Sequence, residues 1–234
     1  MYPEFEIKPP FFEIGTKAYL YGKDVLELAK FADLISAKYE VPIIFTPQYV
    51  DIPLLVQETE HLLIFAQHMD PLPIGRGVGS VLPEAVKAAG AVGVLLNHAE
   101  KPIPHDVLLE TIHRADEVGL ASMACAGNLQ EVEIVTKMNP NILLAEAPEL
   151  IGTGERSDED QEAIRIINQL VWSINPQIPV LHGAGISDEK DVYQVIAKGA
   201  QATGSTSGIV LADDPLGMIE KMIRNIRLAW DATH

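Results

Sequence analysis

A hydrophobic strand ends on a carboxylate in the stretch Leu144-Ala145-Glu146-Ala147-Pro148-Glu149-Leu150-Ile151-Gly152-Thr153-Gly154, and two glycines close the short segment that follows. A glutamate at a strand end, beside a loop that can hinge, is typical of a proton-abstracting base under a lid. Similar apolar runs recur on both sides of this stretch along the chain. The fold is predicted from that series.

Short β-branched runs alternate with amphipathic helical segments. We expect strands at 11–14, 41–45, 62–66, 91–96, 120–124, 142–145, 180–181 and 202–203. Helices are expected at 22–38, 52–57, 81–89, 107–117, 129–138, 159–173, 189–198 and 216–229. Helices between successive strands force parallel pairing, so the series favours one (β/α)8 barrel domain over residues 1–234. An open, doubly wound sheet is the alternative.

Composition excludes several classes of partner. The 33 acidic and 17 basic side chains give a net charge of −16, which repels nucleic acid and anionic membranes. No apolar stretch reaches the roughly 20 residues that a bilayer requires, and the N-terminus is acidic, so we expect a soluble, cytoplasmic protein. The single cysteine, Cys125, permits no internal disulfide and no cysteine cluster for zinc. Neither a metal nor a redox cofactor is indicated.

Polar residues follow several of the predicted strands, at the barrel end where active sites lie. They are Lys17, Gln67, His68, Asn97, His98, Glu146 and the glycine-rich segments 183–187 and 204–208. Glycine-rich loops after the last two strands often bind phosphate in such barrels, because glycine permits close approach of the backbone. Hydroxyl groups at Ser187, Ser205, Thr206 and Ser207 add donors. We therefore expect a small phosphorylated substrate.

Several motifs carry a family resemblance in order along nearly the whole chain. They are Phe65-Ala66-Gln67-His68-Met69-Asp70, Val81-Leu82-Pro83-Glu84-Ala85-Val86, Leu95-Leu96-Asn97-His98, the segment from Glu146 to Gly154, and Gly183-Ala184-Gly185-Ile186-Ser187. Together they resemble the triosephosphate isomerase family, in particular its compact archaeal-type branch. The resemblance implies a barrel enzyme that needs no cofactor.

The resemblance also implies site residues. Glu146 would be the catalytic base, His98 the neutral electrophile, and Lys17 the cation that stabilises negative charge on the substrate. Glu100 would position this lysine. Cys125 matches a family cysteine beside the base and is given no chemistry.

The same resemblance implies a lid and a phosphate site. The lid would span Pro148 to Gly154 and exclude water from the intermediate. Backbone amides near Gly152, Ser187, Thr206 and Ser207 would hold the phosphate. The loop Gly75–Gly79 would dock into a neighbouring subunit, which predicts a homodimer or homotetramer.

Three positions depart from the family pattern. Gly15 replaces an asparagine whose amide contacts the substrate, and Val78 replaces a threonine that reaches this asparagine across the dimer. Ala99 replaces a serine that binds the base in the open enzyme. Loss of these groups would weaken a standard triose isomerase, whereas the space left at Gly15 would suit a longer sugar phosphate.

We therefore expect an isomerase that interconverts a ketose phosphate and an aldose phosphate through an enediolate, with triose phosphate or a related short-chain sugar phosphate as substrate. Two alternatives stay open. One is another phosphosugar barrel enzyme, such as an aldolase in which Lys17 forms a Schiff base. The other is a barrel that binds sugar phosphate without catalysis.

Overall fold

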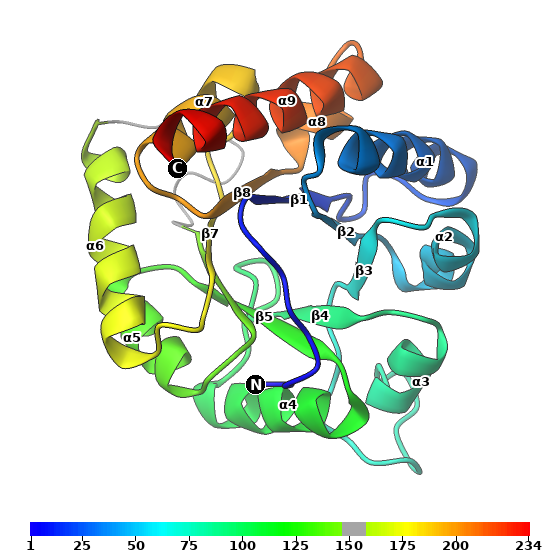
Figure 1. Ribbon diagram of the computed structural model, residues 1–234. Coiled ribbons are helices and arrows are strands. Elements are labelled where there is room, and N and C mark those ends of the chain that lie inside the picture. The colour runs from blue at the N-terminus through cyan, green and yellow to red at the C-terminus, as the bar shows by residue number, and fades with distance from the viewer. Residues whose placement is uncertain (147–157) are drawn as a thin grey trace.

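A computed structural model describes residues 1–146 and 158–234. Eight parallel strands close into a barrel in sequence order, with the helices arranged around the outside (Figure 1). The strands are β1 Phe11–Gly15, β2 Ile43–Thr46, β3 Leu63–Ala66, β4 Gly93–Leu96, β5 Ala121–Ala126, β6 Ile142–Ala145, β7 Val180–His182 and β8 Ala202–Ser205. The predicted (β/α)8 barrel is confirmed, and closure between β1 and β8 excludes the open sheet.

Helices connect the successive strands of the barrel. They are α1 Gly22–Tyr39, α2 Ile52–Glu58, α3 Pro83–Ala88, α4 His105–Val118, α5 Leu129–Lys137, α6 Asp158–Ile174, α7 Glu189–Ala197, α8 Ser207–Val210 and α9 Pro215–Thr233, with the 3-10 helix η1 at Tyr49–Asp51. The eight predicted helices are present, whereas η1 and α8 were not predicted. Segments of three or four residues are too short to show a helical period.

Capping side chains explain where two of the helices begin. Asp188 caps α7 by accepting from the amides of Lys190 and Asp191, and Asn128 caps α5 by accepting from the amide of Glu131. Such caps satisfy backbone donors that have no partner within the helix. These two helices therefore start at fixed positions directly after the loops at the open end of the barrel.

The apolar core has two layers. One lies between strands and helices, and the other fills the barrel interior with residues from alternate strand positions, including Phe11, Ile44, Phe65, Met123 and Leu144. Gly93 makes room for the Phe65 ring, because a Cβ at position 93 would lie 2.3 Å from the Phe65 Cζ. Above this apolar layer the inward positions become polar, and there the site begins.

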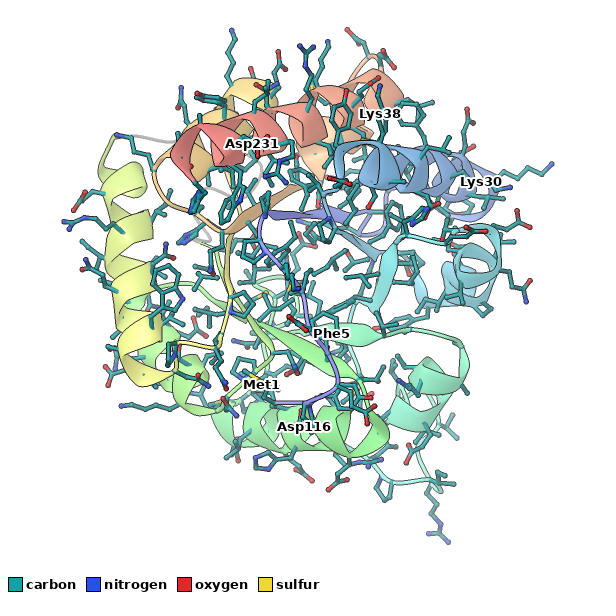
Figure 2. The ribbon with its side chains drawn as sticks, viewed as in Figure 1. Met1, Phe5, Lys30, Lys38, Asp116 and Asp231 are labelled. Carbon is teal, nitrogen blue, oxygen red and sulfur yellow. The ribbon has the colours of Figure 1, made fainter. Side chains whose placement is uncertain are left out.

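The N-terminal segment closes the opposite end of the barrel. It runs across the barrel from the side of α4 to β1 (Figure 1), and the Phe5 ring packs edge-on against Phe65 with centroids 5.8 Å apart. Figure 2 shows Met1 beside Asp116, where the amino group and the carboxylate lie 2.6 Å apart. A ligand therefore enters from the carboxyl ends of the strands. Within the described ranges, no helix combines the length and apolar character needed to cross a bilayer.

Candidate active site

A cavity of about 440 Å³ opens at the carboxyl ends of the strands. Its wall includes most of the residues named from the sequence: Gly15, Lys17, His98, Glu100, Glu146, Thr206 and Ser207. They come from β1, β4, β6 and β8 or from the loops that follow these strands. The barrel thus brings together side chains that lie up to 190 positions apart in the chain.

Glu146 and His98 face each other across this cavity. The Oε2 atom of Glu146 lies 3.1 Å from Nε2 of His98, and each side chain is 14% exposed. The same Oε2 is buried and accepts no hydrogen bond of regular geometry from the described residues. A buried carboxylate oxygen without a donor is uncommon and needs a reason. The polar neighbour of this oxygen is Nε2 of His98, and both residues line the cavity.

The imidazole of His98 is fixed in one neutral form. Its Nδ1 atom accepts a hydrogen bond of 3.1 Å from the backbone N–H of Glu100. Because only an unprotonated nitrogen can accept, the neutral ring carries its proton on Nε2. That N–H points toward Glu146 and the cavity. The ring is therefore arranged to donate a hydrogen bond to a bound oxygen.

Asn97 anchors the loop that carries His98. It has a positive φ of 58°, and its side-chain amide donates to the Cys125 carbonyl at 3.0 Å and to Oε1 of Glu131 at 3.0 Å. Its Oδ1 accepts from the amide of Ile103 at 2.9 Å. Asparagine tolerates the left-handed conformation better than most residues. Asn97 is therefore a positioning residue beneath His98, and its side chain does not line the cavity.

Lys17 lies beyond β1 in a left-handed conformation, with φ of 45°. Side-chain amides of Gln48 and Gln67 donate to its backbone carbonyl at 2.6 and 2.9 Å, which holds this unfavourable backbone in place. Its Nζ lies 2.6 Å from Oε1 of Glu100, so the contact expected from the sequence is present. Glu100 is 57% exposed, and the hydrogen bond from Lys17 lowers the pKa of its carboxyl group.

The end of β3 fixes the two ends of the exposed third loop. Nε2 of His68 lies 3.1 Å from Oδ1 of Asp70, and burial lowers the pKa of this histidine. Oδ2 of Asp70 accepts from the amide of Val81 at 2.7 Å, which closes the base of the loop. Between these ends, Ile74 and Val78 are exposed to solvent. The described chain therefore presents two apolar side chains on a closed loop.

The two glycine-rich loops form the part of the wall that follows β7 and β8, and the second of them lies next to the end of β1. Gly208 in α8 packs so closely that a Cβ there would lie 2.7 Å from the Ile186 carbonyl oxygen. As the first residues of α8, Ser207 and Gly208 have amides without an acceptor inside that helix. Ser187 departs from the expectation, because it is outside the cavity wall and its amide donates to Oδ2 of Asp191 at 2.8 Å. Gly152 and the lid, Pro148 to Gly154, lie outside the described residues.

Gly183 sets the position of the Glu146 side chain. A Cβ at position 183 would lie 3.3 Å from Oε1 of Glu146 and 3.0 Å from Cδ1 of Leu144. Position 183 therefore has no space for a larger residue unless the carboxylate moves. The sequence predicts that Gly183 belongs to a phosphate-binding loop, and in the structure this glycine also lies beside the Glu146 carboxylate.

Gly15 does not leave empty space, which corrects the sequence-based expectation. A Cβ at this position would lie 2.9 Å from Oγ1 of Thr206, 3.0 Å from Oε1 of Glu13 and 3.3 Å from Oγ1 of Thr46. The volume beside Gly15 is therefore occupied by polar side chains, above all by the Glu13 carboxyl group. Room for a longer substrate at this point is not present.

Glu13 is the cavity residue that sequence reasoning missed. It stands two positions before Gly15 on β1, so the period of the strand places both residues on the same face, and Lys17 beyond the strand lines the same cavity. A lone glutamate within the apolar run Phe11-Phe12-Glu13-Ile14 was the available signal. Burial raises the pKa of Glu13 to about 7, and the nearby Glu146 carboxylate adds to this rise.

Cys125 lies on β5 beside Leu144 of β6, near the two carboxyl groups. Burial raises the pKa of its thiol well above the usual range, and the charges of Glu146 and Glu13 act in the same direction. A thiol that stays protonated is a poor nucleophile. The contacts of Cys125 therefore describe a small core residue at the edge of the site.

Comparison with known proteins identifies the family. A family profile described as "Triosephosphate isomerase" matches residues 14–222. Triosephosphate isomerase of Methanobacterium bryantii is 36% identical over 225 residues, which cover 94% of this chain and 99% of that protein. The triosephosphate isomerase of Sulfurisphaera tokodaii is 37% identical over 229 residues, covering 96% and 99% of the two chains. The chain therefore belongs to the triosephosphate isomerase family.

Proposed function

We propose that this chain interconverts dihydroxyacetone phosphate and glyceraldehyde 3-phosphate, with Glu146 as the base, His98 as the electrophile and Lys17 as the stabilising cation. The observation that carries the assignment of the base is the buried Oε2 of Glu146, which has no regular hydrogen-bond donor and lies 3.1 Å from Nε2 of His98. A carboxylate that is free to accept a proton, beside a neutral donor, is the pair that isomerisation requires.

The reaction needs no external oxidant or reductant. Glu146 takes a proton from C1 of the ketose, the C–H electron pair forms the C1=C2 bond, and the C2=O π pair moves to oxygen. The N–H of His98 faces that oxygen and donates to it as the negative charge develops. Return of the carbon-bound proton to C2, with transfer of the hydroxyl proton from O1 to O2, gives the aldose. C1 is oxidised and C2 is reduced within one molecule.

The phosphate group would lie at the wall formed by Thr206 and Ser207. The N-terminal amides of a helix and the hydroxyl groups beside them suit an anion. Lys17, after the neighbouring strand β1, supplies positive charge to the same cavity, so the net charge of −16 does not prevent binding of a dianionic substrate. The amide of Ser187 already has Asp191 as acceptor and is left out of this phosphate site.

The contacts of Lys17 argue against an aldolase. A Schiff-base lysine needs an unprotonated amine in an apolar surround. The Nζ of Lys17 instead lies 2.6 Å from a carboxylate oxygen of Glu100. A sensor without catalysis would have no use for a buried carboxylate that lacks a donor, because such a group weakens the fold.

We further propose that the barrel is the single domain of the chain and that it forms a homodimer or homotetramer through the loop Gly75–Gly79. Val78 on this loop and Ile74 directly before it are exposed in the isolated chain, at 109% and 74%. Large apolar side chains displayed on one closed loop are suited to burial against a second copy.

The test is a substrate panel. Purified protein is assayed with dihydroxyacetone phosphate, glyceraldehyde 3-phosphate and four- and five-carbon ketose and aldose phosphates, and each reaction is repeated with borohydride. We expect isomerisation of the triose phosphates with the highest kcat/KM and no borohydride adduct at Lys17. A covalent adduct at Lys17, or tight binding of every substrate without turnover, would refute the proposed reaction.

A further inference from the structure

Three residues form a cradle around the Glu13 carboxyl group. Oγ1 of Thr46 donates to Oε1 of Glu13 at 2.6 Å. On the other side, Gly204 of β8 lies beside Glu13 in the sheet register, and a Cβ there would lie 2.9 Å from Oε2. Gly15 makes room above, as a Cβ there would lie 3.0 Å from Oε1. The two glycines therefore leave space for the carboxyl group, and the Thr46 hydroxyl donates a hydrogen bond to it.

The second oxygen of Glu13 remains available to a ligand. Oε1 accepts the Thr46 hydroxyl, so a proton on this carboxyl group resides on Oε2. Oε2 has no hydrogen-bond partner among residues 1–146 and 158–234, and Glu13 forms part of the cavity wall. A protonated Glu13 carboxyl group has one O–H donor, which can donate a hydrogen bond to a ligand in the cavity.

We propose that Glu13 acts as a neutral hydrogen-bond donor to the oxygens of the enediolate intermediate, in the place where Gly15 provides no side-chain donor. This role rests on the proposed isomerase function and adds a catalytic residue to it. The carboxyl group that carries this donor compensates for the missing amide at position 15: its Oε1 fills the space that a side chain at that position would enter, and its Oε2 carries the proton to be donated. Preorganised donors of this kind act where charge develops in the transition state.

The charged groups around Glu13 influence whether its carboxyl group is neutral or ionised. Glu146 after β6 disfavours ionisation, whereas Lys17 after β1 favours it, as a protonated His98 after β4 would. Cys125 on β5 also faces Glu13, and its raised pKa keeps it uncharged. Burial outweighs these effects and raises the pKa of Glu13 to about 7. The neutral form donates to an enediolate, whereas the ionised form would repel it.

A loss of activity at alkaline pH follows from this assignment. Around pH 7 about half of the molecules carry a neutral Glu13, and two pH units higher only about one in a hundred does. If the donor is needed, kcat/KM falls on the alkaline side with a midpoint near the pKa of Glu13. Thr46 lowers that pKa through its hydrogen bond, so its removal moves the midpoint to higher pH.

The experiment compares pH profiles of kcat/KM for the wild type, Glu13→Gln, Glu13→Ala and Thr46→Val. Glutamine keeps a donor at every pH, so Glu13→Gln is expected to stay within several-fold of wild type at pH 7 and to lose the alkaline fall. Glu13→Ala is expected to lose ~10²-fold relative to wild type below pH 7, as for removal of one oxyanion donor, and to lack the alkaline fall, so that the two profiles converge at high pH. Thr46→Val should keep the alkaline fall at a higher midpoint.

Two results would overturn the assignment of Glu13: an unchanged alkaline fall in Glu13→Gln, or near wild-type activity in Glu13→Ala below pH 7. Failure of the proposed function has a different signature, since the wild type itself would not isomerise triose phosphates. A second measurement decides the matter without turnover. The 13C signal of the labelled Glu13 carboxyl group is titrated with and without a phosphorylated hydroxamate that mimics the enediolate. The proposal requires the midpoint to rise when the mimic binds, and an unmoved midpoint rejects it.

Discussion

Nε2 of His98 lies 3.1 Å from Oε2 of Glu146, between the ends of β4 and β6. The backbone amide of Glu100 occupies the other ring nitrogen and leaves the proton on Nε2. The neutral N–H donor of His98 and the carboxylate of Glu146 therefore lie next to each other at the cavity. This arrangement separates the two tasks of the proposed reaction, because the carboxylate moves the carbon-bound proton while the imidazole binds the oxygen.

Asn97 is predicted to control the position of His98 without touching the substrate. Asn97→Ala removes three hydrogen bonds and leaves the buried Cys125 carbonyl and Ile103 amide without this partner, which should cost about 2–4 kcal/mol of unfolding free energy. Urea denaturation measures the loss, and kcat should fall as well. Asn97→Gly is the control, because glycine accepts the positive φ. A glycine variant as stable as the wild type would show that conformation, not hydrogen bonding, is what Asn97 supplies.

Lys17 is predicted to matter for turnover far more than for stability. Lys17→Met should lower kcat/KM by ~10²–10³ through loss of charge stabilisation. Its ion pair with the 57% exposed Glu100 contributes at most about 1 kcal/mol, so the urea midpoint should barely change. Lys17→Arg keeps the charge and serves as the matched control. Full activity of the methionine variant would contradict the role given to this lysine.

Glu13 is predicted to make stability depend on pH. Its pKa is about 7 in the folded chain against 4.5 for an ordinary glutamate, so the folded state binds more protons between these values and stability falls as pH rises through this window. Glu13→Gln removes the penalty. The variant should be more stable than wild type by on the order of 3 kcal/mol at pH 8 and by little at pH 4.

Urea titrations at both pH values measure this difference in unfolding free energy. Glu60→Gln, at an exposed position, is the control and should show no such dependence on pH. An equal gain for Glu13→Gln at pH 4 and pH 8 would mean that Glu13 is not buried as an acid with a raised pKa.

Val78 is predicted to lie in a subunit interface. Val78→Asp places a charge where an apolar side chain would be buried, which should convert the assembly to smaller species in light scattering. Leu34→Asp on α1 is the control, because Leu34 is also exposed, at 66%, but stands apart from loop 75–79. A wild type that is already monomeric, or an unchanged mass for Val78→Asp, would reject this interface.

The sequence predicted the barrel because its signals are local and repeated. Both ends of β6, Ile142 and Ala145, were predicted correctly, because a compact apolar run ends there and the charged Glu146 follows. The Lys17 and Glu100 contact followed from the family resemblance. By contrast, α8 was missed because Ser207–Val210 is a single turn in a Gly/Ser-rich segment.

Gly15 shows why the remaining features could not be predicted. Read along the chain, replacement of asparagine by glycine removes volume and a donor. In three dimensions, side chains from β1 and from the ends of β2 and β8 converge on that point, and Glu13 fills it. The register between strands decides this contact, and no single stretch of sequence carries it. The tautomer of His98 has a different, local origin, because it depends on how the loop after β4 places the backbone amide of Glu100.

The central claim is that Glu146 moves a proton between two carbons of a triose phosphate. Its most direct test is incubation of dihydroxyacetone phosphate in D₂O with the wild type and with Glu146→Gln, followed by 1H NMR. The wild type should form glyceraldehyde 3-phosphate and exchange a C1 proton for deuterium, whereas Glu146→Gln should lose exchange and turnover together by at least ~10³-fold. Exchange by Glu146→Gln at the wild-type rate would contradict the claim.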